Sequence, residues 1–86
     1  MATGGQEMPF EELIRAIAVE LVDHPDEVEV TEIPGDHNCV VELRVAKEDI
    51  GKVIGKEGRT AQSMRTILTA LSAKIGRRGA HLDIVD

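Results

Sequence analysis

The 86-residue chain contains few aromatic residues, cysteines and prolines: it has one phenylalanine, no tryptophan, no tyrosine, one cysteine and three prolines. A single cysteine cannot form an internal disulfide, so a disulfide-stabilised fold is excluded. No stretch approaches the roughly 20 apolar residues that cross a bilayer, and no basic segment followed by an apolar one opens the chain. We therefore expect one small cytoplasmic domain that is held together by its own core.

Charge is divided unevenly along the chain, whose formal net charge is −6. Residues 1–43 carry eleven acids against one base, Arg15, whereas residues 44–86 carry nine bases against five acids. Within residues 52–78, seven bases occur with a single acid, Glu57. A phosphate-binding surface, if the protein has one, is expected in this basic segment. Solvated helix faces that only confer solubility would produce the same counts.

The first half of the chain predicts a helix followed by a hairpin. Apolar residues recur at helical spacing from Phe10 to Leu21, and Pro25 cannot continue the helix, which is expected to end near Asp23 or His24. Apolar and polar residues then alternate over residues 28–30 and 39–45, on either side of a segment rich in turn-forming residues. Each strand has one apolar face, so the hairpin needs a layer of helices to cover it.

The second half predicts a short helix, a long helix and a last strand. A short apolar ridge over residues 50–54 stops at Gly55, a second helix restarts after Gly58, and residues 80–85 alternate. The fold class is therefore α+β, with the order α-β-β-α-α-β. The apolar stripe of the long helix consists of Ala61, Met64, Ile67, Leu68, Leu71 and Ile75.

Two glycines three positions apart, Gly55 and Gly58, separate these two helices. Glycine allows a ligand backbone to approach closely, and the amides at the start of the following helix attract anions. Lys56 and Arg59 add positive charge at the same place, while Glu57 opposes it. A GxxG pattern also occurs as a plain corner between helices, so by itself it leaves both interpretations open.

Two stretches of the sequence, LVDHPDEV at residues 21–28 and IGKVIGKEGRTA at residues 50–61, resemble the KhpA family of small bacterial proteins made of a single KH domain. The element order is similar to that of the type II KH variant. The resemblance implies a three-stranded sheet covered on one face by three helices, and one KH domain over residues 9–86 with the GxxG loop at residues 55–58. Residues 1–8 are expected to form a flexible lead, and the seven residues before Met8 are a departure from the family, because they make the lead longer than is usual there. The shortage of aromatic residues agrees, because RRM and OB-type proteins stack bases on several aromatic side chains.

The resemblance implies binding of about four nucleotides of single-stranded RNA, as an RNA chaperone or post-transcriptional regulator acting as a homodimer or with a KhpB-type partner. The loop residues would contact the sugar-phosphate backbone, with one basic side chain on either side of the loop, and aliphatic residues would line the groove under the nucleobases. A further basic side chain, on the long helix, would be an additional contact. The residues assigned in this way are Lys52, Val53, Ile54, Gly55, Lys56, Glu57, Gly58, Arg59, Ala61 and Arg65.

Catalysis and metal binding have no support in the sequence. The three histidines, His24, His37 and His81, lack paired ligand spacing, and no nucleophile stands beside a base. We expect no enzyme activity, metal, cofactor, small-molecule substrate or membrane partner. The competing hypothesis is a non-catalytic protein-interaction or dimerisation adaptor with a KH-like fold, in which the long helix pairs with a partner and the GxxG is only a corner.

Overall fold

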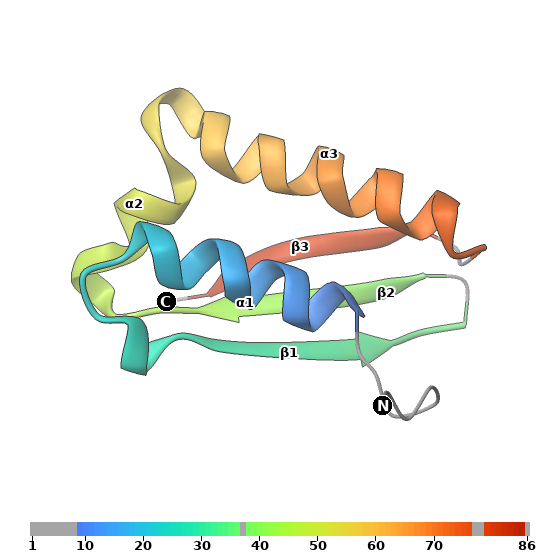
Figure 1. The fold of residues 1–86 in the computed structure, drawn as a ribbon, viewed down its shortest axis with the longest axis horizontal. Coiled ribbons are helices and arrows are strands. Elements are labelled where there is room, and N and C mark those ends of the chain that lie inside the picture. The colour runs from blue at the N-terminus through green and yellow to red at the C-terminus, as the bar shows by residue number, and fades with distance from the viewer. Residues whose placement is uncertain (1–8, 37, 77–78, 86) are drawn as a thin grey trace.

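The computed structural model describes residues 9–36, 38–76 and 79–85, and the expected lead over residues 1–8 lies outside this part of the chain. The predicted order of helices and strands is confirmed (Figure 1). In chain order these elements are α1 (Pro9–Leu21), β1 (Glu29–Pro34), β2 (Cys39–Arg44), α2 (Ile50–Ile54), α3 (Arg59–Lys74) and β3 (Ala80–Val85). No helix among the described residues is both long enough and apolar enough to cross a membrane.

The sheet is mixed and has the order β1-β2-β3. β1 and β2 form the expected hairpin and pair antiparallel, with Pro34 opposite Cys39. β3 lies parallel to β2, with Ala80 beside Cys39. A parallel pair needs a crossover connection, which α2 and α3 supply. The junction between these two helices therefore lies within the crossover, away from the hairpin turn.

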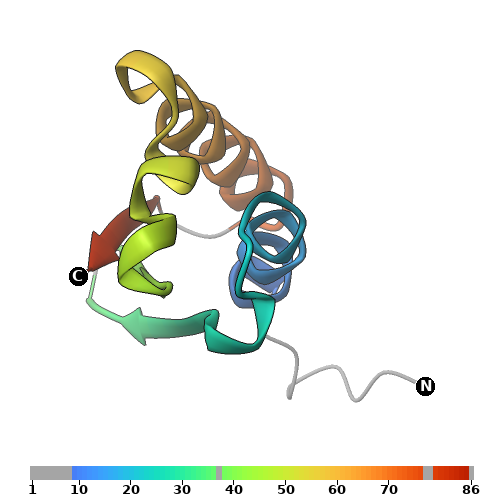
Figure 2. The same ribbon diagram turned by 90° about the vertical axis from the view of Figure 1, so that its left-hand side faces the viewer.

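The helices lie on one face of the sheet, where they enclose the core (Figure 2). Alternate side chains of β2, at positions 39, 41 and 43, point into this layer and are buried. Each large aliphatic side chain removed from water contributes roughly 1.5–3 kcal/mol to folding. Among the described residues, eight apolar side chains of the core are at most 1% exposed: Phe10, Ile14, Ala18, Val41, Leu43, Val53, Met64 and Leu68.

α3 differs from the expected stripe at two positions. Ile67 is 43% exposed and Ile75 is 39% exposed, whereas Leu68 is 0% exposed. Neighbouring helical positions are about 100° apart, so the burial of Leu68 turns Ile67 toward solvent. Ile75 follows the last residue of the helix. The long helix thus combines a buried face with an exposed apolar side chain.

β1 extends further than the alternation at residues 28–30 predicted, because it continues to Pro34. Proline lacks the N–H of a ladder donor and is tolerated on an edge strand such as β1. The continuation also places Glu32 on the inner face of the sheet, where its side chain is 8% exposed. A carboxylate on the inner face explains why the hydrophobic alternation breaks off too early in the sequence.

Candidate nucleic-acid interface

The GxxG loop, residues 55–58, joins α2 to α3 through a tight turn. Gly55, Glu57 and Gly58 all have positive φ angles, of 79°, 58° and 73°. The N–H of Gly55 donates to Gly51 O at 2.9 Å, which closes α2, and the N–H of Gly58 donates to Gly55 O at 3.1 Å. Three residues in this region of backbone space reverse the chain within a single turn.

Glycine is required more strictly at position 55 than at position 58. A Cβ atom on Gly55 would meet Thr60, with the Thr60 Cβ at 2.6 Å and its backbone N at 2.9 Å. A Cβ atom on Gly58 would meet nothing within 4 Å. Gly55 therefore satisfies both a conformational and a steric constraint, while Gly58 satisfies a conformational one alone.

The turn leaves backbone donors available to a ligand. In the described part of the chain, no hydrogen bond uses the N–H of Lys56 or of Glu57. The 16-residue helix α3 begins at Arg59, two residues after Glu57, and its first turn carries the positive end of the helix dipole. Backbone N–H groups and a helix N-terminus together favour an anion such as phosphate.

Mobile positive charge surrounds these donors. Lys56 is exposed, and the Arg59 side chain is 80% exposed. Arg59 Nη2 lies 3.2 Å from Glu57 Oε1, whose side chain is 67% exposed. An exposed ion pair of this kind contributes only about 0–1 kcal/mol, so a phosphate can replace the Glu57 carboxylate as the partner of Arg59.

The aliphatic residues around the loop divide into surface and core. Ile54 is 38% exposed, beside Gly55. Val53 is 0% exposed and Ala61 is 3% exposed, so Ile54 is the one exposed side chain of the three that were expected to line the groove under the bases. The side chains of Val53 and Ala61 pack below the surface because each faces the interior of its helix layer. Arg65 is exposed on α3, one helical turn after Ala61, and so lies on the surface rather than in the core.

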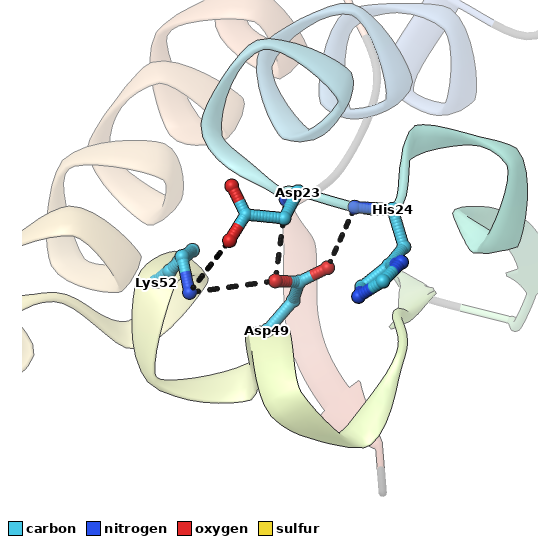
Figure 3. A network of polar contacts seen from close by, with 4 residues as sticks. All are labelled: Asp23, His24, Asp49 and Lys52. Carbon is cyan, nitrogen blue, oxygen red and sulfur yellow. Dashed lines mark hydrogen bonds and ion pairs between the residues drawn. The ribbon is translucent and has the colours of Figure 1, made fainter.

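Lys52 is held by two carboxylates (Figure 3). Its Nζ lies 3.4 Å from Asp23 Oδ2 and 3.5 Å from Asp49 Oδ1. Asp49 is 0% exposed and accepts hydrogen bonds from the backbone N–H groups of Asp23, at 3.2 Å, and of His24, at 3.0 Å. These contacts join the start of α2 to the segment that follows α1.

Asp49 is a residue that sequence reasoning missed. An acid directly before the apolar ridge of a helix is a typical N-cap signal. Asp49 nevertheless makes no side-chain capping bond to its own helix and instead binds N–H groups about 25 positions earlier. No local pattern reveals such a partner, because the contact exists only after α1 and α2 have packed.

The pKa values of both charged partners follow from these contacts. Burial by itself raises the pKa of Asp49, but the N–H groups of Asp23 and His24, and the charges of His24 and Lys52, outweigh it and lower the pKa below its ordinary value. The hydrogen bond and charge of Asp23, with a smaller effect of Asp49, raise the pKa of Lys52 against its partial desolvation. Both groups therefore stay charged over the neutral range.

The element order, the mixed sheet and the GxxG turn between α2 and α3 define a type II KH domain. A family comparison matches residues 11–84 to the family described as KhpA/KhpB, KH domain. The chain belongs to this family, which confirms the resemblance noted in the sequence. Among the described residues, no three histidine, cysteine, aspartate or glutamate side chains gather as a metal-binding group.

Curated relatives support the family assignment, and a solved structure supports the fold. The chain is 53% identical over 69 residues to the RNA-binding protein KhpA of Aquifex aeolicus, covering 80% of this chain and 87% of that one. It is also 53% identical over 76 residues to the RNA-binding protein KhpA of Treponema pallidum, covering 88% and 94%. A crystal structure of Aquifex aeolicus Era has the same fold over 90% of this chain, with a TM-score of 0.57 and 22% identity, but only 31% of the Era chain is matched.

Proposed function

We propose that this chain is a non-catalytic RNA-binding protein that holds about four nucleotides of single-stranded RNA at the GxxG loop. One observation carries the proposal: the backbone N–H groups of Lys56 and Glu57 are unused among the described residues and lie between two glycines of positive φ. The names of the relatives, RNA-binding protein KhpA, support the same function.

The mechanism divides between backbone and base contacts. The loop N–H groups and the side chains of Lys56 and Arg59 receive phosphates, which fixes the strand but carries no sequence information. The bases lie against the side chain of Ile54, and hydrogen bonds from neighbouring groups read the edges of the bases. Arg65 extends the positive track along α3. The grip depends on few cations, so binding weakens as salt rises.

Partner binding supplements this weak grip. Ile67 is 43% exposed on α3, which favours a contact between two copies or with a KhpB-type RNA-binding protein. Linked RNA sites raise overall affinity without any new contact to the nucleic acid. We propose that the assembled protein acts in the cytoplasm as an RNA chaperone or post-transcriptional regulator. The same exposed residue supports the second candidate function, a dimerisation adaptor without RNA binding.

The test is a loop variant in which Lys56 and Glu57 are both replaced by aspartate. Both glycines remain, and aspartate tolerates the left-handed backbone of position 57, so the turn is kept while two anions stand where phosphates bind. The control is Lys74→Asp, which makes the same change in net charge at the other end of α3, about 24 Å away.

Fluorescence anisotropy with labelled single-stranded and duplex RNA distinguishes the two candidate functions. We expect the native protein and Lys74→Asp to bind single strands saturably and the loop variant to lose this binding while its circular dichroism spectrum is unchanged. Equal RNA binding by the loop variant and the control would mean that the GxxG loop is only a turn between two helices. That result would favour the dimerisation adaptor.

A further inference from the structure

Helix α2 is fixed at its N-terminal end by a polar network of Asp23, His24, Asp49 and Lys52 (Figure 3). Asp49 lies directly before α2 and is completely buried, and both of its oxygens accept backbone N–H groups from the segment after α1. Lys52, in the middle of α2, reaches the same carboxylate and also the side chain of Asp23. The network therefore holds α2 from two positions.

The charge around Lys52 is already compensated. Two carboxylates lie within 3.5 Å of its ammonium group, so the three side chains together carry one net negative charge. A phosphate that approached Lys52 would meet this negative charge and would have to displace Asp23 or Asp49. Lys56 and Arg59 offer no comparable obstacle, because no buried acid among the described residues forms an ion pair with either of them.

We propose that Lys52 is a positioning residue, which with Asp23 and Asp49 sets the place of the GxxG loop instead of contacting RNA phosphate. This inference rests on the proposed RNA-binding function of the loop and changes the role that the family resemblance gives to Lys52.

The connection between network and loop is short. α2 has only five residues, and its last hydrogen bond, from Gly55 N–H to Gly51 O, already belongs to the loop. Val53, at 0% exposed, attaches the middle of the helix to the core. A helix of little more than one turn has few contacts of its own, so loss of the polar network lets α2 pivot about Val53 and moves the loop donors with it.

The experiment measures three variants of the network: Lys52→Met, Asp23→Ala and the combination of these two. They are compared with Lys56→Gln, a separate variant that removes a proposed phosphate contact. The Asp23 side chain is 71% exposed, and its replacement keeps the backbone N–H that binds Asp49. Affinity for a single-stranded RNA is measured by anisotropy at several salt concentrations. Hydrogen exchange of the amides of residues 54–59 is measured in the free proteins, and thermal melts verify folding.

Positioning predicts that Lys52→Met and Asp23→Ala each weaken RNA binding by a similar factor, about two- to tenfold, and that the double variant is no worse than either, since the two side chains act as one unit. The slope of log affinity against log salt stays as in the native protein, whereas Lys56→Gln reduces its magnitude by about 0.7. Exchange of the hydrogen-bonded loop amides, those of Gly55 and Gly58, becomes faster in both single variants.

The opposite pattern would overturn the proposal. If Lys52 touches phosphate and Asp23 competes with it, Asp23→Ala tightens binding and Lys52→Met reduces the salt slope as Lys56→Gln does. Unchanged loop exchange in folded variants would also exclude a positioning role. Failure of the native protein to bind any RNA would refute the function proposed for the loop, and the exchange data would still decide whether Lys52 positions it.

Discussion

The glycines at positions 51, 55 and 58 differ in what they require, although all lie within eight residues of one another. Gly55 has a positive φ, and a Cβ atom there would collide with Thr60. Gly58 has a positive φ but open space around a Cβ atom, and Gly51 has open space in a helix. We expect Gly58→Ala to destabilise by about 1–2 kcal/mol and Gly55→Ala by more. Gly51→Ala, the control, should stabilise by about 0.5–1 kcal/mol. Urea denaturation measures the three, and equal costs at positions 55 and 58 would contradict the steric argument.

Glu57 opposes the binding of an anion by the loop that contains it. Its carboxylate lies 3.2 Å from Arg59 and brings negative charge close to the free N–H groups. Glu57→Gln removes that charge and releases Arg59, so RNA affinity should rise up to about fivefold, the equivalent of a surface ion pair of up to 1 kcal/mol. Anisotropy titration checks this expectation. A decrease in affinity would mean that Glu57 itself receives a donor from the RNA.

Asp49 makes stability depend on pH in the acid range. The folded-state pKa is lowered, so the stabilisation is fully present above the unfolded value of about 3.9 and is lost as pH falls through the folded pKa. We expect the native protein to be more stable than Asp49→Asn at pH 7 and this difference to shrink below about pH 4, where the protonated acid resembles the amide. Urea denaturation over pH 3–7 measures it, and a constant difference would contradict the lowered pKa.

Threonine side chains within α3 show how far local chemistry shapes one element. The Thr66 hydroxyl donates to Gln62 O at 3.1 Å, and the Thr69 hydroxyl donates to Arg65 O at 3.1 Å. These bonds share acceptors with the helix backbone and do not offset the low helix propensity of threonine. Thr66→Ala on the exposed face should therefore stabilise by about 0.5 kcal/mol, while Thr66→Gly should not. Thermal denaturation of the two variants decides between propensity and hydrogen bonding.

Periodicity was sufficient to predict the elements but not their faces. The order and nearly all boundaries follow from spacing, turn residues and prolines, because these act within a few positions along the chain. Ile67 belongs to the apolar stripe of the long helix and is nevertheless exposed, because apolar spacing does not specify the rotation of a helix to within one residue. The second half of β1 was not predicted, because Glu32 interrupts the hydrophobic alternation and its place on the inner face depends on tertiary contacts.

The loop could be predicted, but the network that holds it could not. Gly55 and Gly58 predict a turn from the sequence, because the ability to take a positive φ angle is a property of the residue itself. Asp49 and Lys52 are ordinary charged residues in the sequence, and their significance comes from a contact with residues 23–24. A buried polar network of this kind joins two segments that periodicity treats separately, so no local pattern shows that these residues meet.

At the scale of the whole molecule, self-association should depend on the exposed side of α3. Ile67→Asp places a charge in the proposed contact, whereas Thr66→Asp, the control, places it one residue away and about 100° around the helix. We expect sedimentation equilibrium to show a dimer for the native protein and the control and a monomer for Ile67→Asp. RNA affinity should be lower in Ile67→Asp than in the native protein, because the monomer has lost the second linked RNA site. If the native protein is a monomer at all concentrations, the predicted self-association is wrong and the exposed side of α3 contacts a different partner.

The parallel pairing of β2 and β3 sets an order of events in folding. Cys39 pairs with Ala80, 41 positions further along, whereas the β1–β2 hairpin joins neighbouring segments. The entropy of closing a loop rises with its length, so the hairpin can form early while the β2–β3 ladder must wait for the crossover that contains Gly55–Gly58. A nascent chain released before β3 is synthesised would thus carry the loop sequence without the closed sheet beneath it. We therefore expect RNA binding at this loop only after β3 has paired with β2.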